Sequence, residues 1–198
     1  MLGQLDLFAA PAIGFDAGFA AVRRRELAHG AWVDHVPSWV TGHAALFDQL
    51  ELSWQTELRQ MYERVVTTPR LLASVPQTGI VEAMRVAISE RYGEPFVRTT
   101  AALYRDGNDS VAPHGDTTAR DLLEALVATV SLGQPRRLRM RPTEGGASIH
   151  YDLGLGDLFV MGGTCQRTWR HSVPKTAQAR GPRIAVMFRP AWAASYDD

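Results

Sequence analysis

The sequence predicts a mainly β fold with N-terminal helices, an α+β protein whose later strands form a sandwich or barrel. From Val97 onward, apolar residues recur at every second position, and turn-forming residues separate the apolar runs at short intervals. Before that point, apolar residues recur at helical spacing. At 198 residues the chain fits a single domain, 1–198. We divide it into a helical and lid extension over 1–96 and a β core over 97–192.

Two segments of the first half carry the helical pattern. Thr41 to Arg64 has apolar residues at helical spacing, although polar residues in its middle can divide it into two shorter helices. Gly79 to Tyr92 has one apolar stripe, and Gly93 followed by Pro95 supplies the stop signal. We therefore expect helices in both segments.

The second half reads as a series of short strands. Val97 to Tyr104 alternates apolar and polar residues, and Asp106-Gly107-Asn108-Asp109 ends the pattern. The later predicted strands are Leu126 to Leu132, Arg137 to Arg141, Ser148 to Leu153, Asp157 to Met161, Thr168 to Val173 and Arg183 to Arg189. Leu122 to Val130 is ambiguous, because its leucine-rich segment would also form a helix.

Composition narrows the classes of function. The 21 basic and 21 acidic residues cancel, so net charge gives no argument for a nucleic-acid or anionic-membrane partner. Cys165 is the only cysteine, which excludes an internal disulfide framework and a cysteine-based zinc site. The single cysteine leads us to expect a reducing, cytoplasmic setting, and we also expect a monomer. We expect no membrane association, since no run approaches the roughly 18 apolar residues of a membrane span.

His114-Gly115-Asp116, with His171 further along the chain, offers a candidate metal site. Residues two apart in a strand face the same side, so His114 and Asp116 can both point at one ion. Two imidazoles and one carboxylate can occupy one face of an octahedral ferrous ion and leave its other positions open. Taken alone, each motif has a simpler interpretation, as a solvated histidine in a turn or a histidine hydrogen-bonded at a sheet edge.

The last predicted strand carries two arginines. Its alternation places Arg183 and Arg189 on one face and three apolar side chains on the other. Arginine is rarely buried without a partner, and an inward guanidinium suits a carboxylate ligand. An edge strand with two solvated arginines is the alternative interpretation.

Together these segments resemble the AlkB family of 2-oxoglutarate and Fe(II)-dependent dioxygenases over Thr67 to Trp192. The matching segments are Leu103 to Ser110, His114 to Asp116, Ser131 to Gly133, Gly156 to Leu158, Met161 to Gly163, Trp169 to Lys175 and Arg183 to Arg189. The resemblance implies a double-stranded β-helix (jelly roll) core over 97–192. It also implies the cofactor Fe(II), the co-substrate 2-oxoglutarate and dioxygen, with oxidative removal of alkyl groups from nucleobases in DNA.

The resemblance also implies roles for individual residues. The metal ligands, and hence the catalytic residues, are His114, Asp116 and His171. Tyr104 and Arg183 would hold the distal carboxylate of 2-oxoglutarate, and Arg189 would lie near Asp116 and the ligand-side carboxylate. Family members commonly carry asparagine where this chain has Ala102 and Ala185, and those asparagines assist co-substrate binding.

For the substrate, the resemblance implies alkylated DNA, single-stranded or with a flipped base. Repair members usually carry an acidic residue, facing the lesion, where this chain has Thr118. Thr67 to Leu71, with Arg70, resembles part of the family's nucleotide-recognition lid. Arg139 and Arg141 belong to a dense basic run that could follow phosphates, or could simply form a solvated sheet face.

Other functions stay open at this stage. An oxygenase of the same fold could act on RNA, a protein side chain or a small molecule, because fold and iron chemistry do not fix the substrate. A zinc hydrolase with the same three ligands leaves the paired arginines unexplained. A non-catalytic module that binds nucleic acid or a partner is the third alternative.

Overall fold

The computed structural model describes residues 12–50, 52–61, 64–118 and 121–190, and it describes residues 57–61 and 64–68 by their backbone alone. The strands are β1 (Gly14–Phe15), β2 (Arg23–Glu26), β3 (Ala31–Val36), β4 (Val40–Thr41), β5 (Gln55–Met61), β6 (Arg64–Ser74), β7 (Phe96–Tyr104), β8 (Val111–His114), β9 (Val127–Gly133), β10 (Arg136–Pro142), β11 (Ile149–Leu153), β12 (Asp157–Gly163), β13 (Trp169–Val173) and β14 (Arg183–Pro190). The helices are α1 (His43–Gln49), α2 (Gly79–Tyr92) and α3 (Cys165–Thr168), with a 3-10 turn at Ala28–Gly30.

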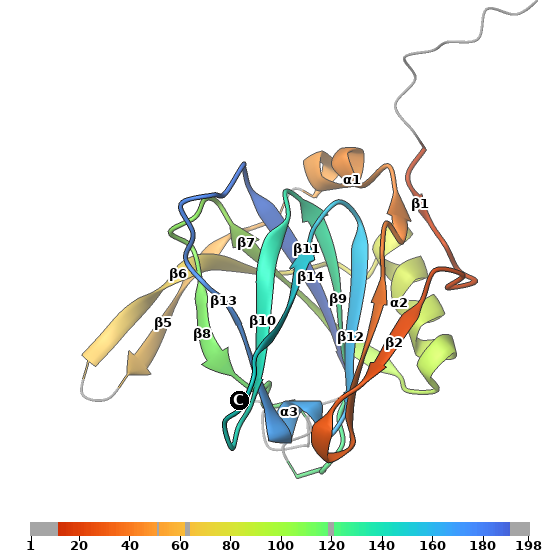
Figure 1. Ribbon diagram of the computed structural model, residues 1–198. Helices are drawn as coiled ribbons and strands as arrows, with labels where there is room; N and C mark the ends of the chain where they lie inside the picture. The colour runs from red at the N-terminus through yellow and green to blue at the C-terminus, as the bar shows by residue number, and fades with distance from the viewer. Residues whose placement is uncertain (1–11, 51, 62–63, 119–120, 191–198) are drawn as a thin grey trace, which may run out of the picture.

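Two antiparallel sheets form the body of the protein (Figure 1). The larger has eight strands in the order β2-β3-β12-β9-β14-β7-β6-β5, and the smaller has four in the order β11-β10-β13-β8. Side chains of both sheets meet in one buried cluster, in which Met140 of β10 lies with Phe159 of β12 and Ala185 of β14. Most of the central strands pair with strands distant in sequence, such as β12 with β3 and β14 with β7, and two facing sheets connected in this way form a jelly roll. The mainly β prediction is confirmed.

The outer face of the large sheet is covered by helices. Met84 and Ile88 of α2 are buried in one cluster with Val186 and Phe188 of β14. β14 also lies between β9 and β7, so both of its edges are hydrogen-bonded. A strand paired at both edges and buried on both faces is fixed in position, and the edge-strand interpretation of this segment is wrong.

The helix prediction for the N-terminal part is only partly right. α2 has the predicted limits, but among the described residues between Thr41 and Arg64 the helix is limited to α1, and β5 follows. β5 pairs with β6, a strand rich in β-branched residues such as Val65 and Val66, and both join the large sheet. Strand pairing therefore outweighs the local helical spacing. In Figure 1 this hairpin projects from one side of the molecule.

The later strands agree with the predicted alternation to within a few residues. The ambiguous segment around residues 122–130 is a strand from Val127 onward, and residues 122–126 before it form neither helix nor strand. Residues 1–11 and 191–198, which the predicted domain limits include, lie outside the described residues. None of the described helices combines the length and apolar character needed to cross a membrane.

Candidate metal and co-substrate site

The two candidate histidine ligands face each other across neighbouring strands. His114 of β8 is the register partner of His171 of β13, and their ring centroids are 4.3 Å apart. Nδ1 of His114 lies 2.8 Å from the carbonyl oxygen of Ala112. Because a carbonyl can only accept, Nδ1 carries the proton and Nε2 keeps its lone pair, which is the form that binds a metal.

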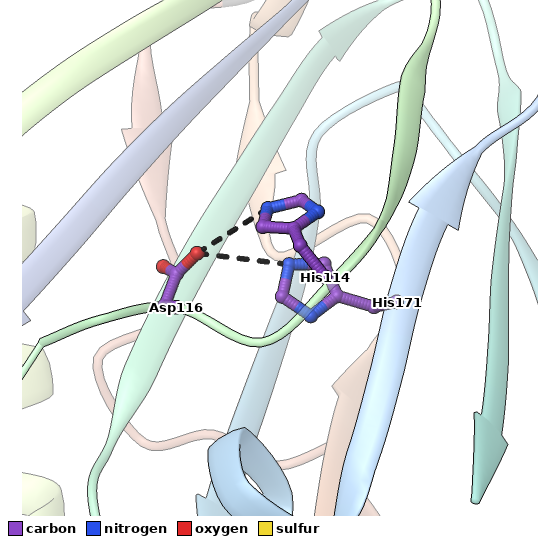
Figure 2. A group of neighbouring side chains, drawn as sticks. All are labelled: His114, Asp116 and His171. Atoms are coloured by element: carbon purple, nitrogen blue, oxygen red, sulfur yellow. Dashed lines mark ion pairs between the residues drawn. The ribbon is translucent and has the colours of Figure 1, made fainter. Parts of the chain in front are cut away.

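Asp116 completes the group from the loop after β8. It lies two residues beyond the end of the strand, so strand alternation is not the reason that it points at His114. Its Oδ1 is 3.5 Å from Nε2 of His114 and 3.8 Å from Nε2 of His171 (Figure 2). Among the described residues, these three side chains place their ligand atoms within 4.8 Å of one another. That spacing suits one shared ion.

The loop that carries Asp116 is fastened to α3. The backbone N–H of Asp116 donates to Oε1 of Gln166 at 2.8 Å, and Arg167 donates to the carbonyl oxygens of Asp116 and Thr118 at 3.1 and 2.8 Å. Gly115 allows this close approach, because a Cβ at its position would lie 2.2 Å from the carbonyl oxygen of Gln166. The metal ligand is therefore positioned by a short helix that directly precedes the strand of His171.

The surroundings of Asp116 and His171 keep these two ligands in their metal-binding forms. Nε of Arg189 donates to Oδ2 of Asp116 at 2.8 Å. Burial favours a protonated carboxyl group, but the positive charge of Arg189 outweighs it and holds the pKa of Asp116 below its usual range. Burial, together with His114, lowers the pKa of His171 to about 3, so its imidazole is neutral at physiological pH. An anionic carboxylate and two neutral imidazoles suit Fe(II).

A cavity of about 940 Å³ opens over the metal ligands and is lined by predicted co-substrate residues. Tyr104 of β7 and Arg183 of β14 are register partners, and each is 2% exposed. Arg183 donates from Nη2 to Oγ of Ser131 at 2.7 Å. Arg189 also lines the cavity, as predicted from the strand alternation, and donates from Nη1 to Oγ1 of Thr100 at 2.8 Å.

The surroundings of Arg183 favour an anionic ligand. Its Nε is buried and has no hydrogen-bond partner in the structure. Burial, helped by the nearby guanidinium groups of Arg136 and Arg70, lowers the pKa of Arg183 to about 10. Arginine remains charged at neutral pH, so a buried guanidinium with an unused donor is suited to a carboxylate. The residues present thus fit 2-oxoglutarate as well as Fe(II).

Arg70 lies in the co-substrate part of the cavity. It was predicted to contact substrate as part of a lid, but its side chain is 7% exposed and its Nη1 donates to the Tyr104 hydroxyl at 3.0 Å. The side chains of Thr67 and Thr68, which belong to the same predicted lid, lie outside the described residues. Burial on β6 beside β7, rather than exposure on a lid, places Arg70 near Tyr104.

Thr118 also differs from its predicted place. The side chain is fully buried, its Oγ1 has no hydrogen-bond partner in the structure, and it does not line the cavity. The neighbouring Thr117 does line the cavity. Arg167 donates a hydrogen bond to the Thr118 carbonyl oxygen, and with the backbone fixed in this way the Thr118 side chain points into the protein interior. A direct contact between Thr118 and substrate is not supported.

The basic run on β10 divides between the two faces of its sheet. Arg136 is buried, and its guanidinium donates to the carbonyl oxygens of Asp106, Asp109 and Pro174. Arg139 and Arg141 are exposed on the opposite face and do not line the cavity. A phosphate contact by these two arginines stays a prediction.

Several positioning residues could not be recognised from the sequence. Gln166 and Arg167 hold the Asp116 loop, Ser131 holds Arg183, and Thr100 holds Arg189. Gln166 and Arg167 come just before the His171 strand, and Ser131 lies in a segment that matches the family. Proximity to these motifs was the available signal, but their partners are distant in sequence.

Gly115→Ala should weaken metal binding at least tenfold and lower stability by about 1–3 kcal/mol, because the added methyl group would collide with backbone rather than with a movable side chain. Mn(II) calorimetry and thermal denaturation measure the two effects. Gly18→Ala is the control, since its methyl group would meet first the Asp16 carboxylate oxygen at 3.3 Å. Unchanged metal affinity in Gly115→Ala would show that the α3 contact does not position Asp116.

Comparisons with known proteins agree with this geometry. A model of the 2OG-Fe(II) oxygenase superfamily matches residues 34–189. Protein R406 of Acanthamoeba polyphaga mimivirus is 31% identical over 147 residues, which cover 74% of this chain and 75% of that protein. The alpha-ketoglutarate-dependent dioxygenase alkB homolog 3 of Homo sapiens is 30% identical over 146 residues, 69% of this chain and 50% of the relative. The DNA oxidative demethylase ALKBH2 of Homo sapiens is 26% identical over 126 residues, 60% of this chain and 48% of the relative.

The chain spans about half the length of these two human relatives. Among solved structures, a prolyl hydroxylase of Trichoplax adhaerens in complex with a hypoxia inducible factor peptide is similar, with a TM-score of 0.54 and 13% identity over 75% of this chain and 74% of that one. OsALKBH1 gives a TM-score of 0.54 and 13% identity over 85% of this chain and 100% of that one. Both likenesses concern the fold alone. The family model and the alkB relatives show that the chain belongs to the 2OG-Fe(II) oxygenase superfamily as an AlkB-family member, a family that uses Fe(II), 2-oxoglutarate and dioxygen.

Proposed function

We propose that this oxygenase removes alkyl groups from nucleobases in DNA. One observation carries the oxidative part of the proposal: His114, Asp116 and His171 converge in a cavity that also holds the buried Arg183. The DNA part is supported by the relatives, one of which is named a DNA oxidative demethylase. A base inside a duplex cannot reach such a cavity, so the substrate would be single-stranded or have its target base flipped out.

One group of side chains in the cavity would bind the metal, and another would bind the co-substrate. His114, Asp116 and His171 would hold Fe(II), and Arg189 keeps Asp116 anionic and oriented. Tyr104 and Arg183 would bind the distal carboxylate of 2-oxoglutarate at the other end of the cavity. When bound, Fe(II) and 2-oxoglutarate supply the electrons that reduce dioxygen, with release of succinate and CO2 and insertion of one oxygen atom into a substrate C–H bond.

For an N-methylated base, the inserted oxygen gives an N-hydroxymethyl group. This group loses formaldehyde and leaves N–H on the base, so the sum of the two steps restores the unmodified base. Neither step requires an activated nucleophile of the protein. The site therefore needs tight positioning of metal and co-substrate rather than a nucleophile and general-base pair.

The oxygenase part is tested by an anaerobic titration with Fe(II) and 2-oxoglutarate, followed by admission of air. We expect a weak visible charge-transfer band and then succinate. Folded protein that gives neither the band nor succinate would overturn the proposal.

The substrate is tested with N-methylated and etheno bases in single- and double-stranded DNA and in RNA, scored by released aldehyde and restored base. Succinate formation without restoration of any DNA base would favour an RNA, protein or small-molecule substrate.

Reversing the charges of Arg139 and Arg141 should weaken binding of single-stranded DNA. Both side chains are exposed on β10, and removal of one phosphate-binding charge should reduce the slope of log K against log salt by roughly 0.7. The Arg139→Glu/Arg141→Glu protein is compared with Arg23→Glu/Arg25→Glu, which changes the same charge on exposed residues of β2. Equal affinities and slopes in the two proteins would exclude a DNA path over β10.

A further inference from the structure

Arg70, Tyr104 and Arg183 form a row across three neighbouring strands of the large sheet. Arg183 of β14 is the register partner of Tyr104 of β7. On the other side of β7, Leu71 of β6 pairs with Leu103, so Arg70 comes next in the ladder beside Tyr104. Side chains at directly opposed positions of a sheet lie close together on the same face. The register therefore places a guanidinium on each side of the Tyr104 phenol.

The side-chain contacts agree with this row. Arg70 donates from Nη1 to the Tyr104 hydroxyl at 3.0 Å. The guanidinium carbons of Arg70 and Arg183 lie 6.0 and 5.4 Å from the Tyr104 ring centroid. All three residues are buried and line the same cavity. The Tyr104 hydroxyl therefore lies beside two guanidinium groups, those of Arg70 and Arg183.

The charges of this row favour an anion. The two guanidinium groups are held near each other in a buried setting, where like charges repel strongly. Arg70 is one of the groups whose positive charge lowers the pKa of Arg183. A carboxylate between the two arginines would relieve that repulsion and use the buried Nε of Arg183. The row is therefore better suited to an anionic group than either arginine alone.

Two neighbouring positions offer no polar side chain. Ala102 and Ala185 are register partners on β7 and β14, 0% and 4% exposed, at the places where the AlkB resemblance leads one to expect asparagine. Their methyl groups cannot donate hydrogen bonds to a co-substrate. Arg70 of β6, the strand next to β7, lines the same cavity as Ala185 and supplies a charged donor.

We propose that Arg70 is a second guanidinium ligand of the distal carboxylate of 2-oxoglutarate, which it binds together with Tyr104 and Arg183. This inference rests on the proposed co-substrate roles of Tyr104 and Arg183. In this proposal, a second charged side chain recognises the distal carboxylate in place of the neutral amides of the family members that carry asparagine. The proposal also makes Arg70 a co-substrate ligand rather than a DNA ligand.

Calorimetric titration of 2-oxoglutarate into Mn(II)-loaded protein tests the proposal without turnover. Arg70→Met should weaken 2-oxoglutarate binding roughly 10- to 100-fold, the range for loss of a hydrogen bond to a charged group. Arg70→Lys should lose less, because it keeps the charge without the planar fork. Arg98→Met is the matched control: Arg98 also lines the cavity, but its position pairs with Arg189. Its affinity should change by a few-fold at most.

Two comparisons separate direct binding from support of Tyr104. If Arg70 only holds the phenol, Arg70→Met should have no further effect in a Tyr104→Phe background; if it binds the carboxylate, it should weaken binding there as well. The ligand 2-oxopentanoate, which lacks the distal carboxylate, should bind wild type and Arg70→Met equally weakly.

The outcomes distinguish failure of this inference from failure of the proposed function. Wild-type protein that binds Mn(II) but not 2-oxoglutarate would overturn both. Wild-type protein that binds 2-oxoglutarate, with unchanged affinity in folded Arg70→Met or no further effect in the Tyr104→Phe background, would overturn the role of Arg70 alone. If Arg70→Met does not fold, the Arg70→Lys titration decides, since wild-type affinity in that variant would show that the guanidinium of Arg70 is not a ligand of the carboxylate.

Discussion

His171→Ala should abolish turnover and reduce metal affinity at least roughly 100-fold, beyond the 10- to 100-fold typical of losing a residue that only supports a ligand. His171 supplies one of the three convergent ligand atoms, and the remaining pair leaves the metal open on that side. Calorimetry with Mn(II) measures binding, and succinate formation measures turnover. His150→Ala, an exposed histidine of β11 outside the metal group, is the control.

Asp116→Ala should abolish turnover too, but with an added cost in stability. It leaves the guanidinium of Arg189 largely buried without its carboxylate partner, which typically costs about 3–5 kcal/mol. Combining it with Arg189→Met should recover much of that stability and none of the metal affinity. Turnover in either His171→Ala or Asp116→Ala would overturn the metal assignment.

Arg183→Met should raise the dissociation constant for 2-oxoglutarate by roughly 100-fold, the upper range for a charged hydrogen bond. Arg183 is fully enclosed, so no solvent-exposed arginine can replace it, and the Ser131 hydroxyl also loses its donor. Metal affinity should be unchanged, because the contacts of Arg183 do not include the metal ligands. High concentrations of 2-oxoglutarate should restore succinate formation.

Titration of the co-substrate at fixed Mn(II) measures this effect. Arg183→Lys should fall between wild type and Arg183→Met, because a lysine keeps one charge but loses the paired donors. A weakened metal affinity with normal co-substrate affinity would contradict the assignment of Arg183 to the co-substrate end of the cavity.

Much of this site was predictable because it lies on strands with simple alternation. The spacing of Arg183 and Arg189 placed both on one face, and the cavity lining confirms it. The pairing of His114 with His171 was not predictable from spacing, because it depends on the register between β8 and β13. The alternation of residues along a strand indicates which face of the sheet a side chain lies on, whereas the register between strands decides which side chains it contacts.

The places where the structure differs from the sequence pattern have the same origin. The Thr41 to Arg64 segment has real helical spacing, but its second half contains strand β5. β5 pairs with β6, and β6 is held in the large sheet by its pairing with β7. Arg70 belongs to a segment that resembles the family's lid, and its place beside Tyr104 becomes evident only when β6 is paired with β7. Thr118 is two residues from a metal ligand, yet Arg167, from α3, turns its side chain away from the cavity. Each case required a contact between segments distant in sequence.

The facing histidines of β8 and β13 have a thermodynamic consequence. An unfolded chain does not bring these two residues and Asp116 together, so a metal that needs all three binds the folded state alone. Such a ligand shifts the folding equilibrium by mass action, by about 2.7 kcal/mol when its free concentration is 100 times its dissociation constant. The melting temperature of this protein should therefore rise with the concentration of available metal, so that iron supply would influence the folded fraction as well as the activity.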